Sequence, residues 1–287
     1  MGDTRIEKTI RQNRKIARCA RFLWVCLIVV ACGSNSSWEQ RFKESVNLPM
    51  PNLSVSPADP DVFSFAMVGD LHVGGGDTSR FRQILQAAQS EGDSFIVLLG
   101  DISDKGELES FEAVQTALQD FGYQNKVLPL LGNHDIFGDG WQEYKKIWGA
   151  SHYTAVVGNS RFIVLDTADG IVGEEQWDWL VSEVNSSPPS RTFILSHYMP
   201  VVPGQRTYLR LANQLEAERL MNLASRKEIT GFYGGHYHSY CQEQIAGVDY
   251  VVAGGGGGRR MEPVEGYFFI QVKVSKTGVQ YELKMVP

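Results

Sequence analysis

Five short apolar runs in this chain each end at a glycine or a serine, and polar side chains follow at once. Apolar runs of this length, separated by segments of helical period, predict buried strands of an α/β fold. In such folds the groups at the carboxyl ends of neighbouring strands meet at one rim. The side chains in question are Asp70 and His72, Asp101 and Asp104, Asn133, His134 and Asp135, His197, and His236 and His238. Five of the six histidines therefore share one predicted location.

The element order supports a mixed α/β fold. We expect strands at residues 63–70, 94–101, 126–133, 161–167, 191–197 and 229–236, and helices at 78–89, 107–121, 174–184 and 213–228. The tail, 247–256 and 265–286, is typical of consecutive antiparallel strands. Helices should lie outside and strands inside, but chain order alone leaves open whether there is one sheet or two. His152 stands apart from this pattern, and we expect it to be a surface or loop residue.

The N-terminal region predicts membrane targeting. Residues 1–31 contain seven Lys or Arg and two acidic residues, and an apolar run at 22–32 follows the charges. That run is too short to span a bilayer as a helix but is typical of a secretory signal. Its end, VVACGS, resembles the lipobox of bacterial lipoproteins, in which Cys32 would carry lipid. An uncleaved anchor or a wrongly assigned start codon would be the alternatives.

We therefore divide the chain into a targeting segment at 1–32, a polar, proline-containing linker at 33–61 and a folded domain at 62–287. The formal net charge is −6 and the first 31 residues contribute +5, so the remainder carries −11. An acidic body argues against nucleic-acid partners, which require basic surfaces. Of four cysteines, Cys241 alone remains in the predicted domain, so no structural disulfide is expected.

The clustered side chains have the chemistry of a two-metal site. Carboxylate, amide oxygen and imidazole suit hard-to-borderline divalent metals, and no thiolate is offered. Seven candidate ligands are too many for one tetrahedral ion but suit a pair that shares a carboxylate. In an extended segment, residues i and i+2 lie about 7 Å apart on one side, so His236 and His238 can each bind a different ion. Taken singly, each Asp or Asn could be only a turn former or a helix cap.

The blocks DxH at 70–72, GDxxDxG at 100–106, GNHD at 132–135, His197 and GHxH at 235–238 resemble those of the calcineurin-like metallophosphoesterases over residues 63–260. The resemblance implies a four-layer αββα double β-sandwich. It also implies a binuclear centre of Mn, Fe or Zn that Asp101 bridges. One metal would be bound by Asp70, His72, Asp101 and His238, and the other by Asp101, Asn133, His197 and His236.

The same resemblance implies the chemistry. A metal-bridging hydroxide would attack a phosphomonoester or phosphodiester in line, while His134 contacts the transition state or protonates the leaving oxygen. Asp135 would orient His134, Asp104 would be a weaker supporting residue, and Asn133 and His134 would contact substrate. Asp104 stands where purple acid phosphatases have a metal-binding tyrosine, which argues against that branch.

Two alternatives remain at this stage. The chain could be a non-catalytic scaffold of the same family or a metal-storage protein, although all seven ligand positions and His134 are filled. The run Gly254–Gly258, followed by Arg259 and Arg260, suggests either an anion-binding loop or a close-packed turn beside the metals. Arg259 is the substrate-binding candidate from this run.

Overall fold

The computed structural model describes residues 36–186, 190–204, 209–261 and 263–287. The predicted targeting segment at 1–32 lies outside these residues. In the described part of the chain, no helix combines the length and the apolarity that crossing a membrane requires.

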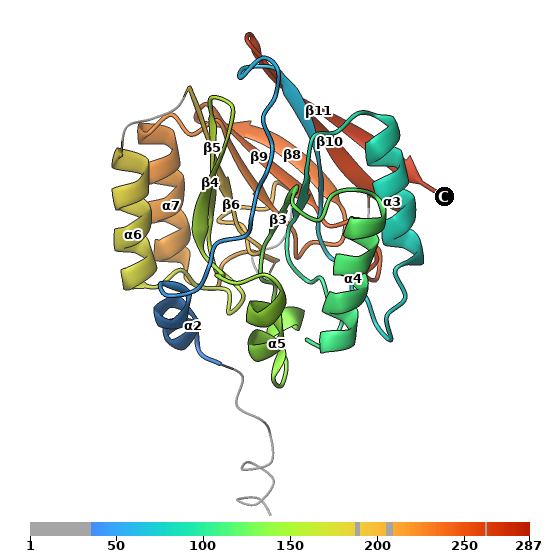
Figure 1. Cartoon of the computed structure of the whole chain (residues 1–287). Coiled ribbons are helices and arrows are strands. Elements are labelled where there is room, and N and C mark those ends of the chain that lie inside the picture. The colour runs from blue at the N-terminus through green and yellow to red at the C-terminus, as the bar shows by residue number, and fades with distance from the viewer. Residues whose placement is uncertain (1–35, 187–189, 205–208, 262) are drawn as a thin grey trace, which may run out of the picture. The chain divides into compact units, whose positions relative to one another are not determined.

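Two β-sheets pack face to face and helices cover their outer faces (Figure 1). The first sheet has the order β11-β10-β1-β2-β3, and its strands are β1 (Phe63–Val68), β2 (Ile96–Leu98), β3 (Val127–Pro129), β10 (Tyr267–Ser275) and β11 (Gly278–Val286). The second has the order β4-β5-β6-β7-β9-β8, and its strands are β4 (Tyr153–Val157), β5 (Ser160–Val164), β6 (Arg191–Leu195), β7 (Gly231–Gly234), β8 (Tyr240–Ile245) and β9 (Val248–Ala253). The predicted four-layer αββα sandwich is confirmed.

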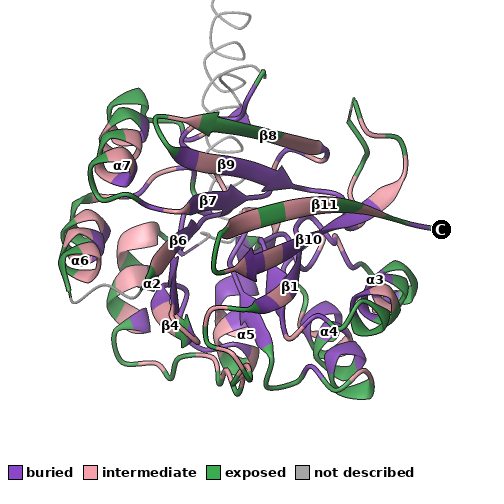
Figure 2. Ribbon diagram, turned by 90° about the horizontal axis from the view of Figure 1, so that it is seen from above, coloured by how far each residue is buried: buried purple, intermediate pink, exposed green. Residues whose placement is uncertain are grey.

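The helices divide between the two outer faces. The first sheet is covered by α3 (Ser79–Ser90), α4 (Leu108–Asp120) and α5 (Gly140–Ile147), and the second by α6 (Glu174–Asn185) and α7 (Gln214–Arg226). The helices α3, α4, α6 and α7 bury one side and leave the other exposed, whereas α5 is buried or half-buried along nearly its whole length (Figure 2). One-sided burial is the pattern that the helical period of the sequence predicts.

Strand β1 shows how the sequence builds both cores. Phe63, Phe65 and Met67 point into the core between the sheets, where Phe162 and Phe193 of the second sheet meet them. The alternate residues Ala66 and Val68 belong to the core under the helices. Successive side chains of a strand point to opposite faces. β1 is apolar on both faces apart from Ser64 near its start, so it must be buried on both sides.

Three sequence predictions about the elements need correction. The strand β9 does not pair with its successors: it lies in the second sheet, parallel to β7 and antiparallel to β8. Only β10 and β11 form the predicted antiparallel pair. The strands β4 and β8 were not predicted. In the case of β8, the strand lies at a sheet edge and its sequence, YCQEQI, is largely polar and exposed.

The predicted linker is wrong for residues 36–61, which pack on the domain. They begin with helix α2 (Trp38–Ser45), whose N-cap is the side chain of Ser37. Arg41 of this helix is fully buried, and its guanidinium binds the carboxylates of Asp166, at 2.9 and 3.0 Å, and of Asp169, at 3.0 Å. Farther along, backbone carbonyls of Pro49 and Pro60 accept hydrogen bonds from the body.

His152 is also buried, contrary to the prediction. Its ring stacks on Phe42 of α2 with a centroid distance of 4.3 Å and meets the edge of Trp179 at 4.8 Å. Burial lowers the pKa of its imidazole to about 4, so the residue is a neutral part of the core at neutral pH. Its position beneath α2 explains the error, since α2 was itself not predicted.

The buried pair made by Arg41 predicts a large loss of stability on truncation. Arg41→Ala leaves Asp166 without its buried counter-charge and should lower the free energy of unfolding by about 3–5 kcal/mol. The control is Arg82→Ala, which removes a half-exposed pair with Asp120 and should cost less than about 1 kcal/mol. Urea unfolding of the full chain measures both, and equal losses would contradict a structural role for α2.

Candidate metal centre

The predicted ligands lie on loops that leave the carboxyl ends of strands from both sheets. Asp70 and His72 follow β1, Asp101 follows β2, and Asn133 follows β3 in the first sheet. From the second sheet, His197 follows β6, while His236 and His238 follow β7. The packing of the two sheets brings these loops together, as the spacing of the motifs predicted.

Four of these residues form a first donor group: Asp70, His72, Asp101 and His238. One donor atom from each lies within 4.8 Å of all the others. His72 Nε2 is 3.5 Å from Asp101 Oδ2, and His238 Nε2 is 3.4 Å from Asp70 Oδ1. This is the set that the family resemblance implied for one ion.

A second donor group adjoins the first and shares Asp101 with it. Asp101, His197 and His236 bring their donor atoms together, and His197 Nε2 is 3.5 Å from Asp101 Oδ2. The amide oxygen of Asn133 lies 3.0 Å from His197 Nε2 and 3.1 Å from His236 Nδ1. Asn133 therefore presents a neutral oxygen to this group, which matches the set implied for the other ion.

The hydrogen bonds behind the histidines test whether a cation fits. His238 Nδ1 lies 2.8 Å from the carbonyl oxygen of Arg259, and His197 Nδ1 lies 2.8 Å from that of Leu99. Because a carbonyl only accepts, both Nδ1 atoms carry a proton, so both Nε2 atoms face inward as the ones that can bind a cation, whether a proton or a metal ion. His72 Nδ1 similarly faces the carboxylate of Asp104 at 3.2 Å.

The inward nitrogens of His72 and His238 lie too close together to be left without a proton or a cation between them. His72 Nε2 and His238 Nε2 lie only 3.1 Å apart. Two neutral imidazoles with protonated Nδ1 atoms would turn lone pairs toward each other at that distance, which is repulsive unless a proton or a cation lies between them. A divalent cation bound by both nitrogens and by Asp70 and Asp101 removes this conflict, so the residues present fit a metal.

Backbone strain is concentrated at the same residues. Six non-glycine residues in the described part of the chain have positive φ, and four are predicted ligands: Asp70 (60°), His72 (46°), Asp101 (51°) and His236 (64°). Such conformations cost on the order of 1–3 kcal/mol each and persist where the surroundings enforce them, commonly at functional sites. Here they turn the ligands inward directly after the strands end.

The charges of the site are strongly coupled. Burial by itself would raise the pKa of Asp101, but His197 and His72 hold it well below its usual range. Burial opposes protonation of His197, yet Asp101 raises its pKa to about 9. Burial and the neighbouring His197 lower the pKa of His236 to about 4. Asp101 is therefore an ionised carboxylate that attracts positive charge from both sides.

His134 lies beside the two donor groups without belonging to either. Its side chain is about one-third exposed, and its ring meets the edge of His72 at 4.4 Å. Its backbone N–H donates to Asp101 Oδ1 at 2.8 Å, which fixes the residue next to the shared carboxylate. This is the location expected for a group that contacts substrate.

The predicted role of Asp135 needs correction, because it does not contact the ring of His134. Asp135 is fully buried and accepts backbone hydrogen bonds from Ser103 and Gly132, both at 2.8 Å. It thereby ties the loop after β2 to the loop after β3. The ring of His134 is oriented by the carbonyl oxygen of Asp104, 2.7 Å from Nδ1, a backbone contact that residue types cannot reveal.

The glycine run 254–258 is a close-packed turn behind the ligands. A side chain at Gly254 would meet Asp70 Oδ2 at 2.7 Å, and one at Gly258 would meet the rings of His238 and His72 at 2.5 and 2.7 Å. Glycine is thus required for the turn to pass the ligands. Arg259 orients His238 through its carbonyl oxygen, while its side chain is exposed. A contact between that side chain and substrate stays a prediction.

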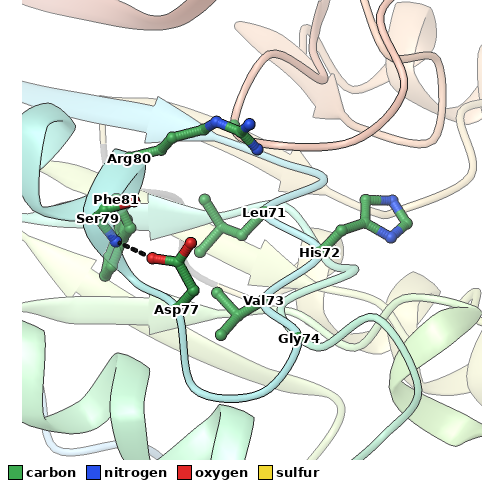
Figure 3. A pocket seen from close by; sticks show the side chains of 9 residues that line it. Leu71, His72, Val73, Gly74, Asp77, Ser79, Arg80 and Phe81 are labelled. Atoms are coloured by element: carbon green, nitrogen blue, oxygen red, sulfur yellow. Dashed lines mark hydrogen bonds between the residues drawn. The ribbon is translucent and has the colours of Figure 1, made fainter.

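A cavity of about 240 Å³ lies next to His72, on the side away from the donor groups. Its wall includes Leu71, Asp77 and Arg80. Figure 3 shows the ring of His72 pointing away from the side chains of Asp77 and Arg80. This cavity lies behind the loop after β1 and does not face the donor groups.

Comparison with known proteins agrees with this geometry. The family model described as calcineurin-like phosphoesterase matches residues 63–240, more than half of the chain. The chain belongs to the calcineurin-like phosphoesterase family. Members of this family use divalent metals, and the two donor groups of this phosphoesterase provide Asp and His side chains for them.

Curated relatives are similar at low identity. A probable cyclic nucleotide phosphodiesterase of Fibrobacter succinogenes is 25% identical over 203 residues, which is 64% of this chain and 76% of that protein. A 3′,5′-cyclic-nucleotide phosphodiesterase of Nostoc sp. is 25% identical over 207 residues, which is 66% of this chain and 76% of that protein.

Solved structures share the fold of this phosphoesterase. A dimetal phosphatase from Danio rerio superposes with a TM-score of 0.61 and 16% identity over 79% of this chain and 100% of that one. A purple acid phosphatase from yellow lupin superposes with a TM-score of 0.65 and 16% identity, over 81% of this chain and 54% of that one. At these identities the likeness concerns the fold alone.

The shared carboxylate predicts the metal content of this phosphoesterase. Asp101→Asn keeps the shape of the side chain but removes the charge that serves both groups, so affinity for both ions should fall by more than about 100-fold. His238→Ala should lower the affinity for one of the two ions only. The measurement is Mn²⁺ or Zn²⁺ bound per chain, by calorimetry and elemental analysis. The control is Asp120→Asn, an exposed acidic residue outside the site, and equal metal content in Asp101→Asn and this control would contradict the shared-ligand arrangement.

Proposed function

We propose that this chain is a phosphodiesterase that uses two divalent metal ions and hydrolyses cyclic nucleotides or closely related phosphodiesters. The observation that carries the proposal is the pair of adjacent donor groups that share Asp101. The metals, when bound, supply Lewis-acid activation of water and of the phosphoryl oxygens. The names of the Fibrobacter and Nostoc relatives support a diester, and a cyclic nucleotide in particular.

The charge of the donor groups favours an anionic substrate. Asp70 and Asp101 are the two carboxylates among the proposed ligands of two divalent ions, so the loaded site keeps a positive surplus. Asn133 contributes oxygen without charge, whereas aspartate at that position would cancel part of the surplus. A phosphodiester carries one negative charge and is held by this excess.

His134 is proposed to donate the proton that the leaving oxygen needs. Its Nδ1–H donates to the carbonyl oxygen of Asp104, and the two heavy atoms are 2.7 Å apart. The remaining ring nitrogen, Nε2, is then the atom that can carry a second proton toward substrate. The partial exposure of the ring and its edge contact with His72 support a position between solvent and the donor groups.

The non-catalytic scaffold is less well supported. A scaffold needs neither the inward donor atoms nor the strained backbone at Asp70, His72, Asp101 and His236. It also gives no reason for His134 to be held beside Asp101 without joining either of the two donor groups that contain Asp101.

Substitution of His134 separates these functions. His134→Ala should lower kcat for a cyclic nucleotide by about 10²–10⁴-fold, the usual contribution of a positioned proton donor, with bound metal unchanged. His152→Phe is the matched control, because that histidine lies in the core under α2. The measurement is kcat for hydrolysis of a cyclic nucleotide with added Mn²⁺. Wild-type kcat in His134→Ala would contradict the assignment, and no hydrolysis by wild-type protein would favour the scaffold.

We also propose that the protein is exported and tethered to the cell envelope through Cys32. The basic segment, the short apolar run and the sequence VVACGS support this. The mature protein should then begin at a lipid-modified Cys32, and Cys32→Ser should release it from the membrane fraction of the native host. Mass spectrometry that finds an intact Met1 with an unmodified Cys32 would contradict the proposal.

A further inference from the structure

A second cavity adjoins the donor group that contains His236. It has a volume of about 550 Å³ and is lined by residues of three segments: Asp169, Gly170, Tyr198, Arg210, Leu211, Ala212 and Gln214. We call it the Tyr198 cavity. Tyr198 separates the cavity from the donor group, since the centroid of its ring lies 3.8 Å from that of His236. One aromatic ring thus lies between this space and the second donor group.

The wall made by Tyr198 is held in place by its own backbone. Its N–H donates to Thr167 Oγ1 at 3.0 Å, and its carbonyl accepts from Ser196 Oγ at 2.8 Å. Elsewhere in the lining, the N–H of Ala212 donates to the carbonyl of Gly170 at 2.8 Å. The wall is therefore formed before any ligand arrives, which reduces the entropy lost on binding.

The remaining lining decides which chemical group fits. Gly170 and Ala212 keep the space open, because a side chain added at Gly170 would lie 3.8 Å from Ala212 Cβ and 3.9 Å from Tyr198 Cδ1. Asp169 is already engaged by Arg41 at 3.0 Å. Arg210 is half-buried and has no hydrogen bond or ion pair within the described residues. Among the described residues, the cavity thus offers one aromatic ring and one guanidinium that has no partner there.

We propose that the Tyr198 cavity binds the nucleoside of the substrate, with Tyr198 contacting the base and Arg210 donating hydrogen bonds to its polar edge. The proposal rests on the proposed phosphodiesterase function and names the determinant of its specificity. An aromatic ring with a guanidinium suits a planar heterocycle, because the ring stacks on its face and the guanidinium donates hydrogen bonds to its edge. A lipid chain would require a predominantly apolar lining, which Asp169, Arg210 and Gln214 do not provide. The volume lies within the range of small-molecule sites.

Two substrates with the same reacting bond test the proposal. Thymidine 5′-(p-nitrophenyl phosphate) and methyl p-nitrophenyl phosphate both release p-nitrophenol, and they differ in whether the other alcohol is a nucleoside. The measured quantity is the ratio of kcat/KM for the thymidine ester to that for the methyl ester, with Mn²⁺ present. This ratio cancels any change that acts on the donor groups alone, including one transmitted through His236.

In wild-type protein the ratio should be about ten or more, the effect of stacking one base. Tyr198→Ala and Arg210→Ala should each lower the ratio severalfold, while Tyr198→Phe, which keeps the ring, should preserve it. Arg219→Ala is the matched control for Arg210→Ala, because Arg219 is an arginine of α7 that pairs with Glu174 outside the cavity. It should leave the ratio unchanged.

Three outcomes are distinguishable. A ratio that falls in both alanine variants supports the proposal, and if Tyr198→Ala fails to fold, Arg210→Ala decides alone. A wild-type ratio near one, or equal losses for both esters in the variants, overturns nucleoside binding but leaves the phosphodiesterase function intact. Hydrolysis of neither ester and of no cyclic nucleotide by wild-type protein overturns the proposed function, and the specificity proposal with it.

Discussion

The buried carboxylate of Asp101 is the interaction on which the site depends. Its Oδ2 lies 3.5 Å from both His72 Nε2 and His197 Nε2, so it belongs to both donor groups at once. Its Oδ1 accepts the backbone N–H of His134 and thereby also locates the proposed proton donor. A buried anion is stable only with compensating positive charge. The arrangement therefore requires cations, whether protonated histidines or bound metals.

Each donor group combines residues from both sheets. The first takes three ligands from the loops after β1 and β2 and one from the loop after β7. The second takes Asp101 and Asn133 from the first sheet and His197 and His236 from the second. The site therefore exists only while the sheets are packed. The aromatic core between them, which includes Phe65, Phe162 and Phe193, holds the two halves in register.

The errors of the sequence-based predictions have a common cause. Residues 36–61 are polar and contain prolines, which is typical of a linker, yet α2 docks on the domain through the stacking of Phe42 on His152 and through the buried pair between Arg41 and Asp166. That pair joins residues 125 positions apart, so no local pattern indicates it. His152 was assigned to the surface because the helix that covers it was not predicted. The partner predicted for Asp135 was wrong because its actual partners are backbone N–H groups, which residue types do not indicate.

The sequence by itself determined the strand–helix alternation, the residues at the strand ends and, through its five motifs, the division of ligands into two sets. These features are local, since strand periodicity and the residue after each strand can be read within about ten positions. Tertiary structure decided the two-sheet topology, the place of β9, the docking of α2 and the cavity beside Tyr198. Those depend on which distant segments pack together, and packing is specified by the fit of whole surfaces rather than by any short stretch of chain.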